Sequence, residues 1–383
     1  MDRRNFLIST AGMGAGSLVA AAQTPLAGQP AAAQRTTKLK QSVTQGVFGR
    51  GMAFEDTCKL AADLGFKGYD LRRPADWPTL KKYGLVSTMA YGASPAGGGG
   101  GAGRGGAPGA PGQAGAPGGR AGAPGAPGAP GGAPGGRAGA PGAPGGAPGA
   151  GGQAGGQGRG GGPGGVPNRF NQPTGPNVAN RPGPSSPSSM ELNVKENHDE
   201  QEKLLSATID DCVANGVPNI IVFSGYRTAG GMSDQEAADN CVTFLKRIKG
   251  RAEDKGVNVC MELLNSRVNH RGYIFDHMDW GVDVMTRVDS SRVGMLYDIY
   301  HAAIDDGDVS RAIHNNIKWI KHFHTAGVPG RYQLDDDQEL NYRYIAKVIA
   351  ELNYTGYVGH EYNPTQGADP TACLKQAFEI FDV

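Results

Sequence analysis

Short apolar segments alternate with helical patterns along most of this chain. Between them, apolar positions recur at the spacing of one helix face; Phe54, Cys58, Ala61 and Ala62 follow the i, i+4, i+7, i+8 pattern. Apolar or β-branched runs that end near a polar residue indicate strands. The predicted strands are 41–45, 68–71, 86–91, 219–223, 257–264, 293–299, 317–324 and 356–361.

Capping residues support two of the predicted helices. Ser233 precedes an apolar stripe as an N-cap, and Asp369 is followed by Pro370 at the first helical position. Strands that alternate with helices predict a parallel sheet covered by helices, here a (β/α)8 barrel of the α/β class. An open doubly wound sheet has the same alternation. The first strand is not followed by Gly-x-Gly-x-x-Gly, which argues against the dinucleotide-binding form of that sheet.

Composition changes completely between residues 94 and 189. This segment consists mainly of Gly, Ala and Pro and contains no Asp or Glu. It cannot bury enough apolar surface to offset its ordering entropy, so we expect a disordered insert after the third strand. Its Gly-Ala-Pro triplets lose their register at Gly132, which argues against a collagen helix. The remaining parts, 37–93 and 190–383, together have about 250 residues, the usual size of one barrel.

The first 36 residues resemble a targeting segment. Arg3 and Arg4 begin a twin-arginine pattern, and a mildly apolar, glycine-containing stretch continues to Ala22. Cleavage sites of the Ala-x-Ala type end at Ala22 or Ala33. The stretch is short and glycine-rich for a membrane anchor, so we expect export to the periplasm or the exterior without integral membrane contact.

Charge and cysteine content exclude several kinds of partner and site. Lys and Arg number 37 against 36 Asp and Glu, and this balance gives no electrostatic case for binding nucleic acid or an anionic membrane. The five cysteines are widely spaced and contain no Cys-x-x-Cys, which fits neither a disulfide framework nor a zinc knuckle. We expect them to be buried small side chains.

Polar residues lie at the ends of the last four predicted strands: Glu262, Asp298, His324 and Glu361. One such residue is often a helix cap or an ion-pair partner. A barrel, however, brings these strand ends around one point, where the carboxylates would repel one another without a cation. Oxygen ligands with one imidazole suit Mn²⁺ or Mg²⁺, with Co²⁺ also possible.

Other polar residues are assigned by strand alternation. His322 lies on the same inward face as His324 but one layer deeper, so it is expected to be a satisfied histidine of the barrel core or one that supports a metal ligand. His360 points outward and is expected to be structural. Asp70 could reach the pocket or cap a helix. The acidic run 335–337 is expected to form a solvated loop.

Five motifs occur in an order that resembles one enzyme family: MELLNSR (261–267), DIYH (298–301), HTAGVPGR (324–331), ELNY (339–342) and GYVGHEY (356–362). They resemble the hydroxypyruvate isomerase and ketose 3-epimerase branch of the xylose isomerase-like TIM barrels, specifically over 217–383 and more weakly over 37–93.

The resemblance implies a metal-dependent isomerase or epimerase that moves a proton through an enediolate on a small hydroxy-carbonyl or sugar substrate. It implies that Glu262, Asp298, His324 and Glu361 bind the metal, and that the two glutamates exchange the proton. It also implies substrate contacts for His301 and Arg331. Asn265 is a further substrate-binding candidate, while Arg267 and His270 could line the pocket or the loop surface.

Two features of this chain differ from the pattern of hydroxypyruvate isomerases and argue against hydroxypyruvate as its substrate. Hydroxypyruvate isomerases carry glutamine at the position of His324, and export is unusual for a cytoplasmic pathway. Exported lyases or hydrolases of oxidised sugars, such as 3-keto-glycosides, and a non-catalytic sugar-binding barrel therefore remain alternatives. An endonuclease-IV-like phosphodiesterase needs several histidines spread round the barrel, whereas no histidine precedes His198. A homo-oligomer is compatible with any of these.

Overall fold

The computed structural model describes residues 39–92, 169, 187–227 and 231–383. The predicted export signal and linker, 1–36, lie outside these residues, as does most of the predicted disordered insert, 94–189. Among the described helices, none combines the length and the apolar character needed to cross a membrane.

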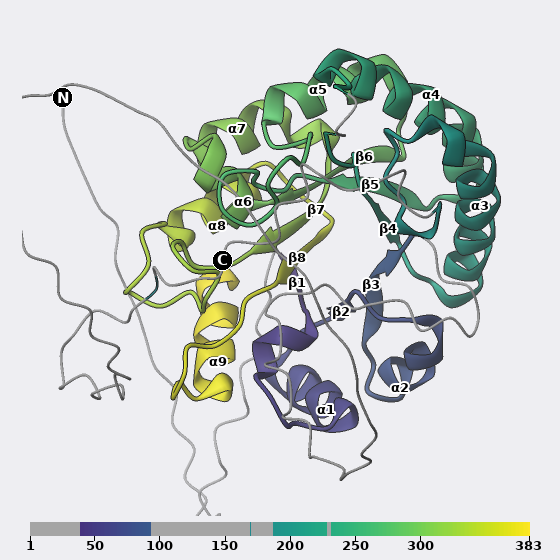
Figure 1. Cartoon of the computed structure of the whole chain (residues 1–383). Coiled ribbons are helices and arrows are strands. Elements are labelled where there is room, and N and C mark those ends of the chain that lie inside the picture. Colours follow the sequence, from purple (N-terminus) through teal and green to yellow (C-terminus); the bar gives the residue numbers. More distant parts are fainter. Residues whose placement is uncertain (1–38, 93–168, 170–186, 228–230) are drawn as a thin grey trace, which may run out of the picture. The chain divides into compact units, whose positions relative to one another are not determined.

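Eight parallel strands close into a barrel in chain order, with β1 paired to both β2 and β8 (Figure 1). This confirms the predicted (β/α)8 barrel and excludes the open sheet. The strands are β1 Lys40–Val43, β2 Gly68–Asp70, β3 Val86–Tyr91, β4 Asn219–Val222, β5 Asn258–Glu262, β6 Val293–Asp298, β7 Ile320–Thr325 and β8 Tyr357–His360.

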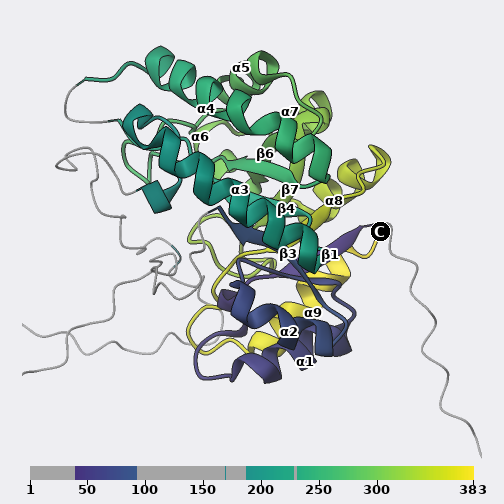
Figure 2. The same cartoon turned by 90° about the vertical axis from the view of Figure 1, so that its right-hand side faces the viewer.

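Helices follow the strands in the chain and lie around the outside of the barrel (Figures 1 and 2). Ser233 caps α4 by accepting from the Glu236 N–H at 3.1 Å, and Asp369 caps α9, as the sequence predicts. The described helices are α1 Phe54–Leu64, α2 Trp77–Lys82, α3 His198–Asn215, α4 Asp234–Lys255, α5 Met278–Val288, α6 Ile299–Asp305, α7 Val309–Asn316, α8 Tyr342–Glu351 and α9 Pro370–Phe381.

The predicted bounds of two strands are wrong for a local reason. The first strand ends at Val43 because Gln45–Phe48 form a 3-10 helix. The seventh begins at Ile320, three residues later than predicted, because Ile317–Trp319 form another 3-10 turn after α7. Apolar side chains in such turns are indistinguishable from strand residues by periodicity alone.

A small apolar cluster lies inside the barrel, separate from the large core between strands and helices. Met89, Ile221, Cys260 and Leu296 form it. Cys260 lies two residues before Glu262, and Leu296 lies two before Asp298, so strand alternation places the cluster directly beneath those carboxylates. All five cysteines are buried and free, as predicted.

Candidate metal centre and active site

Four side chains at the carboxyl ends of β5 to β8 converge at the barrel mouth. Glu262, Asp298, His324 and Glu361 each place one ligand atom within 4.8 Å of the others. Strand register produces this arrangement: Asp298 pairs directly with His324 between β6 and β7. Glu361 follows the last residue of β8, and its N–H still donates to the Thr325 carbonyl at 2.9 Å. The structure therefore brings together the four residues that the sequence singled out.

The imidazole of His324 faces two glutamates. Its Nδ1 lies 2.8 Å from Glu361 Oε2 and 3.6 Å from Glu262 Oε1. Neither this Nδ1 nor Glu361 Oε2 has a hydrogen-bond partner of suitable geometry among the described residues, although both atoms are buried. Buried polar atoms are normally satisfied, so this pair fits a site that a shared cation completes.

Asp298 uses its two carboxylate oxygens differently. Oδ1 caps α6 by accepting from the Tyr300 N–H at 2.8 Å and the His301 N–H at 3.3 Å. Oδ2 faces the mouth, where Arg331 Nη2 lies 3.2 Å away. The cap fixes the carboxylate, and the second oxygen can bind a metal.

The electrostatics of the four residues indicate an excess of negative charge. Burial raises the pKa of Glu262 to about 7 and also raises the pKa of Asp298. Burial opposes ionisation of Glu361 as well, but Arg331 and His324 lower its pKa to about 2. For His324, burial favours the neutral ring, yet Glu361 and other partners raise its pKa well above the usual value. A divalent cation would replace the proton on His324, and three carboxylates with one imidazole form a donor set that suits Mn²⁺ or Mg²⁺.

His301 is oriented to donate a hydrogen bond into the mouth. Its Nδ1 accepts from the Asn265 N–H at 3.1 Å, which leaves the proton on Nε2. Nε2 has no hydrogen-bond partner among the described residues and lies 3.6 Å from Asp298 Oδ2. Burial lowers the pKa of His301 well below its usual value, so the ring is a neutral donor.

Asn265 supports His301. Its Nδ2 lies 2.6 Å from His301 Nδ1, and its Oδ1 accepts from the N–H groups of Val268 and Asn269 at 3.0 and 2.9 Å. These contacts occupy the amide group of Asn265, which therefore holds the His301 ring from the side of Nδ1. His270 packs edge-on against His301, whereas the Arg267 side chain is 68% exposed and pairs with Asp305.

Arg331 is held over the carboxylates by a tight loop. Gly330 and Arg331 both have left-handed backbone, with φ of 97° and 57°, and the Arg331 N–H donates to Gly327 at 3.0 Å. Its Nη2 lies 2.8 Å from Glu361 Oε2. The guanidinium thus lies against two of the four candidate ligands, Asp298 and Glu361.

Tyr91, at the end of β3, is a site residue that sequence reasoning missed. Burial raises the pKa of Tyr91 to about 12, and the charges of Glu361 and Glu262 act in the same direction. Because both charges act on its phenol, Tyr91 is a candidate site residue. The only sequence signal is its position at a strand end.

The predicted insert contains a described residue that is packed against this site. Arg169 is 1% exposed and forms an ion pair with Asp335. Its guanidinium lies 5.6 Å from the ring centre of Tyr332, next to Arg331. Disorder is thus the wrong prediction for Arg169, and likewise for the 3-10 turn Pro187–Ser189. Asp335 is only partly solvated, because the buried arginine draws its carboxylate into an ion pair, whereas Asp336 and Asp337 are exposed as predicted.

Replacing Arg169 by methionine should raise KM for the substrate by roughly three- to tenfold, because small shifts of positioning groups such as Arg331 are costly. The metal affinity should not change, since Arg169 contacts no candidate ligand in the described residues. Steady-state kinetics measure KM, and the exposed Arg343→Met is the matched control. An unchanged KM in Arg169→Met would show that the Arg169–Asp335 ion pair does not influence substrate binding.

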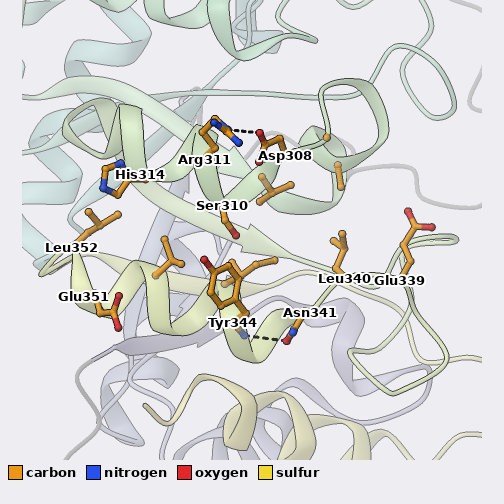
Figure 3. A pocket seen from close by; sticks show the side chains of 15 residues that line it. Asp308, Ser310, Arg311, His314, Glu339, Leu340, Asn341, Tyr344, Glu351 and Leu352 are labelled. Atoms are coloured by element: carbon orange, nitrogen blue, oxygen red, sulfur yellow. Dashed lines mark hydrogen bonds and ion pairs between the residues drawn. The ribbon is translucent and has the colours of Figure 1, made fainter.

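A surface hollow of about 900 Å³ lies between α7 and α8, away from this chemistry (Figure 3). Tyr344 and the Arg311–Asp308 ion pair line it. None of the candidate site residues does, and both helices belong to the outer layer.

Comparisons with known proteins agree with this fold. Residues 185–381, just over half of the chain, match the family model described as a xylose isomerase-like TIM barrel. The 2-oxo-tetronate isomerase of Cupriavidus necator is 33% identical over 138 residues, which cover 35% of this chain and 52% of that protein. A Danio rerio protein provisionally named hydroxypyruvate isomerase is 32% identical over 126 residues, covering 33% and 46% respectively.

This chain therefore spans about half the length of the curated relatives it matches. Among solved structures, D-psicose 3-epimerase from Clostridium cellulolyticum H10, determined with D-tagatose, has a TM-score of 0.54 at 13% identity and covers 90% of this chain and 100% of that one. At this identity the likeness shows a shared fold. The family model and the closed barrel together confirm the predicted resemblance: the chain belongs to the xylose isomerase-like TIM-barrel family.

Proposed function

We propose that this chain is a divalent-metal-dependent isomerase or epimerase that moves a proton within a small hydroxy-carbonyl or sugar substrate. One observation carries the proposal: Glu262 and Glu361 both face His324 Nδ1, and their surroundings move their pKa values in opposite directions. Two carboxyl groups separated in this way can serve as acid and base in one reaction.

Glu262, Asp298, His324 and Glu361 would hold the metal. When bound, a divalent cation supplies Lewis-acid stabilisation of the negative charge that develops on the substrate's oxygens. Mn²⁺ or Mg²⁺ fits the donor set best, and Co²⁺ is also compatible.

The two glutamates divide the proton transfer. Arg331 and His324 favour the ionised form of Glu361, so this carboxylate accepts the proton from the carbon beside the carbonyl, and the C–H electron pair forms the enediolate double bond. Burial favours the protonated form of Glu262, which donates its proton to the neighbouring carbon in isomerisation, or to the opposite face of the same carbon in epimerisation. In isomerisation the hydroxyl proton also passes from one substrate oxygen to the other, so that carbonyl and hydroxyl exchange places. Glu361 then carries the abstracted proton, and exchange with water resets the pair.

His301 and Arg331 would bind the substrate. The Nε2–H of His301 has no partner among the described residues and can donate to a substrate oxygen. Arg331 can form two parallel hydrogen bonds with a carboxylate or contact a distal hydroxyl group. The curated relatives named above include a 2-oxo-tetronate isomerase, whose substrate is a 2-oxo acid, which supports including acids in the substrate panel.

Arg331→Met should raise KM for an acidic substrate by roughly ten- to a hundredfold, the effect of losing one charged hydrogen bond. A neutral ketose should be affected less. Metal affinity should hold or increase, because Arg331 partly neutralises Asp298 and Glu361 in the metal-free protein. Kinetics on both substrate types, with a parallel metal titration, measure these effects. Equal losses for acid and neutral substrates would contradict the assigned contact.

The test of the function is a substrate screen in D₂O with Mn²⁺, using hydroxypyruvate, 2-oxo-tetronate, free ketoses and 3-keto-glycosides. Mass spectrometry should find one deuterium in the product of at least one substrate. Bond cleavage would favour a lyase or hydrolase instead. Saturable binding without exchange would favour a sugar-binding barrel.

A further inference from the structure

A buried carboxylate crosses the interior of the barrel to contact two histidines of β7. Asp70 Oδ2, at the end of β2, lies 2.7 Å from His322 Nε2 and 3.1 Å from His324 Nε2. Its other oxygen accepts from the hydroxyl group of Thr88. All three members of the cluster Asp70–His322–His324 are at most 1% exposed, so these contacts form without competition from water.

A glycine on β8 keeps the space that this carboxylate occupies. A Cβ at Gly359 would lie 2.2 Å from Asp70 Oδ2 and 2.9 Å from His324 Cδ2. Any side chain here would displace Asp70 or turn the imidazole. The close approach of Asp70 to His324 thus depends on residues from β2, β7 and β8.

Three donors converge on the Asp70 carboxylate, two from imidazoles and one from a hydroxyl group. Because Asp70 accepts a hydrogen bond from His324 Nε2, this nitrogen must carry a proton. The neutral ring then has its lone pair on Nδ1, the atom that faces Glu262 and Glu361. Without Asp70 the ring could adopt the opposite tautomer or rotate.

We propose that Asp70 is a positioning residue that fixes the tautomer and orientation of His324 for metal binding, with His322 holding Asp70 from the other side. The proposal rests on the metal site of the proposed function. Partners of this kind raise the basicity of a ligating histidine, and their loss typically weakens metal binding ten- to a hundredfold. The role also explains why a carboxylate and a second histidine are buried deep in the barrel, where apolar residues would pack more simply.

The test compares Mn²⁺ affinity of the full chain and its Asp70→Asn variant by competition with a chelating dye. Asp70→Asn should weaken binding roughly ten- to a hundredfold. Asp56→Asn, which changes an exposed carboxylate in the first turn of α1, is the matched control and should leave the affinity unchanged. The unfolding temperature of the metal-free variants, and kcat at saturating Mn²⁺, are measured in parallel.

A positioning role predicts that saturating Mn²⁺ restores much of kcat in Asp70→Asn, because all four ligands remain. Equal Mn²⁺ affinities of the parent and Asp70→Asn would overturn the proposal. It would also be overturned if the parent bound two Mn²⁺ per chain and the variant only one, because Asp70 would then be a metal ligand itself. If Asp70→Asn does not fold, His322→Gln replaces it, and unchanged affinity in that variant has the same meaning. A parent chain that binds no Mn²⁺ would instead refute the metal site itself.

Discussion

Glu262→Gln and Glu361→Gln are each expected to lower solvent-deuterium incorporation into the substrate by about a hundredfold or more, even at saturating Mn²⁺. A positioned general acid or base contributes roughly 10²- to 10⁴-fold, and an amide can neither accept nor return the proton. Both glutamates face His324 Nδ1, at 3.6 and 2.8 Å, so each is close to any substrate bound beside the metal.

The exposed Glu339→Gln, which lies in the loop before α8, is the matched control and should exchange at the parent rate. Mass spectrometry of the recovered substrate measures exchange, and a chelator-dye titration shows whether each variant still holds Mn²⁺. A glutamine variant that holds Mn²⁺ and exchanges at the parent rate would remove that glutamate from the proton transfer.

Metal binding is expected to stabilise the fold strongly. With free Mn²⁺ at about a thousand times its dissociation constant, linkage adds about 4 kcal/mol to the free energy of unfolding. Calorimetry should show a higher unfolding temperature after Mn²⁺ is added to chelator-treated protein. Asp298→Asn should abolish most of this rise, because an amide oxygen can still cap α6 but the negative ligand atom is lost. The exposed Asp336→Asn should keep the full rise.

The same variant has a second, opposite effect in the metal-free protein. Burial raises the pKa of Asp298 above its usual value, so the folded state binds this proton more tightly than the unfolded chain does. As the pH rises above the usual pKa of an aspartate, the unfolded chain loses this proton before the folded one does. The free energy of unfolding of the metal-free protein therefore falls. Metal-free Asp298→Asn should be at least as stable as the parent at pH 8. A large loss of stability there would mean that the carboxylate supports the fold rather than a cation.

Local sequence pattern was sufficient to predict the barrel and its metal-site candidates. Glu262 and Asp298 each end an apolar run, and the parallel ladder then brings neighbouring strand ends together without further information. The late start of the seventh strand does not move His324 from the mouth, because the position of a side chain there depends on the carboxyl end of the strand.

Contacts across the barrel were not predictable in the same way. Asp70 meets His324 over a separation of 254 residues, and alternation shows only which face a side chain takes. The space left by Gly359 depends on three strands at once. Arg169 was missed because its surroundings have the composition of a disordered segment, and composition averages over a single anchoring residue.

The central claim is that one divalent cation binds among Glu262, Asp298, His324 and Glu361. Crystals of the full chain grown with Mn²⁺ and measured at the manganese absorption edge test it most directly. The account predicts a single anomalous peak per chain, about 2 Å from one atom of each of the four side chains, as is usual for hard divalent cations. No peak at saturating Mn²⁺, or a peak centred between Asp70 and His322 instead, would contradict it.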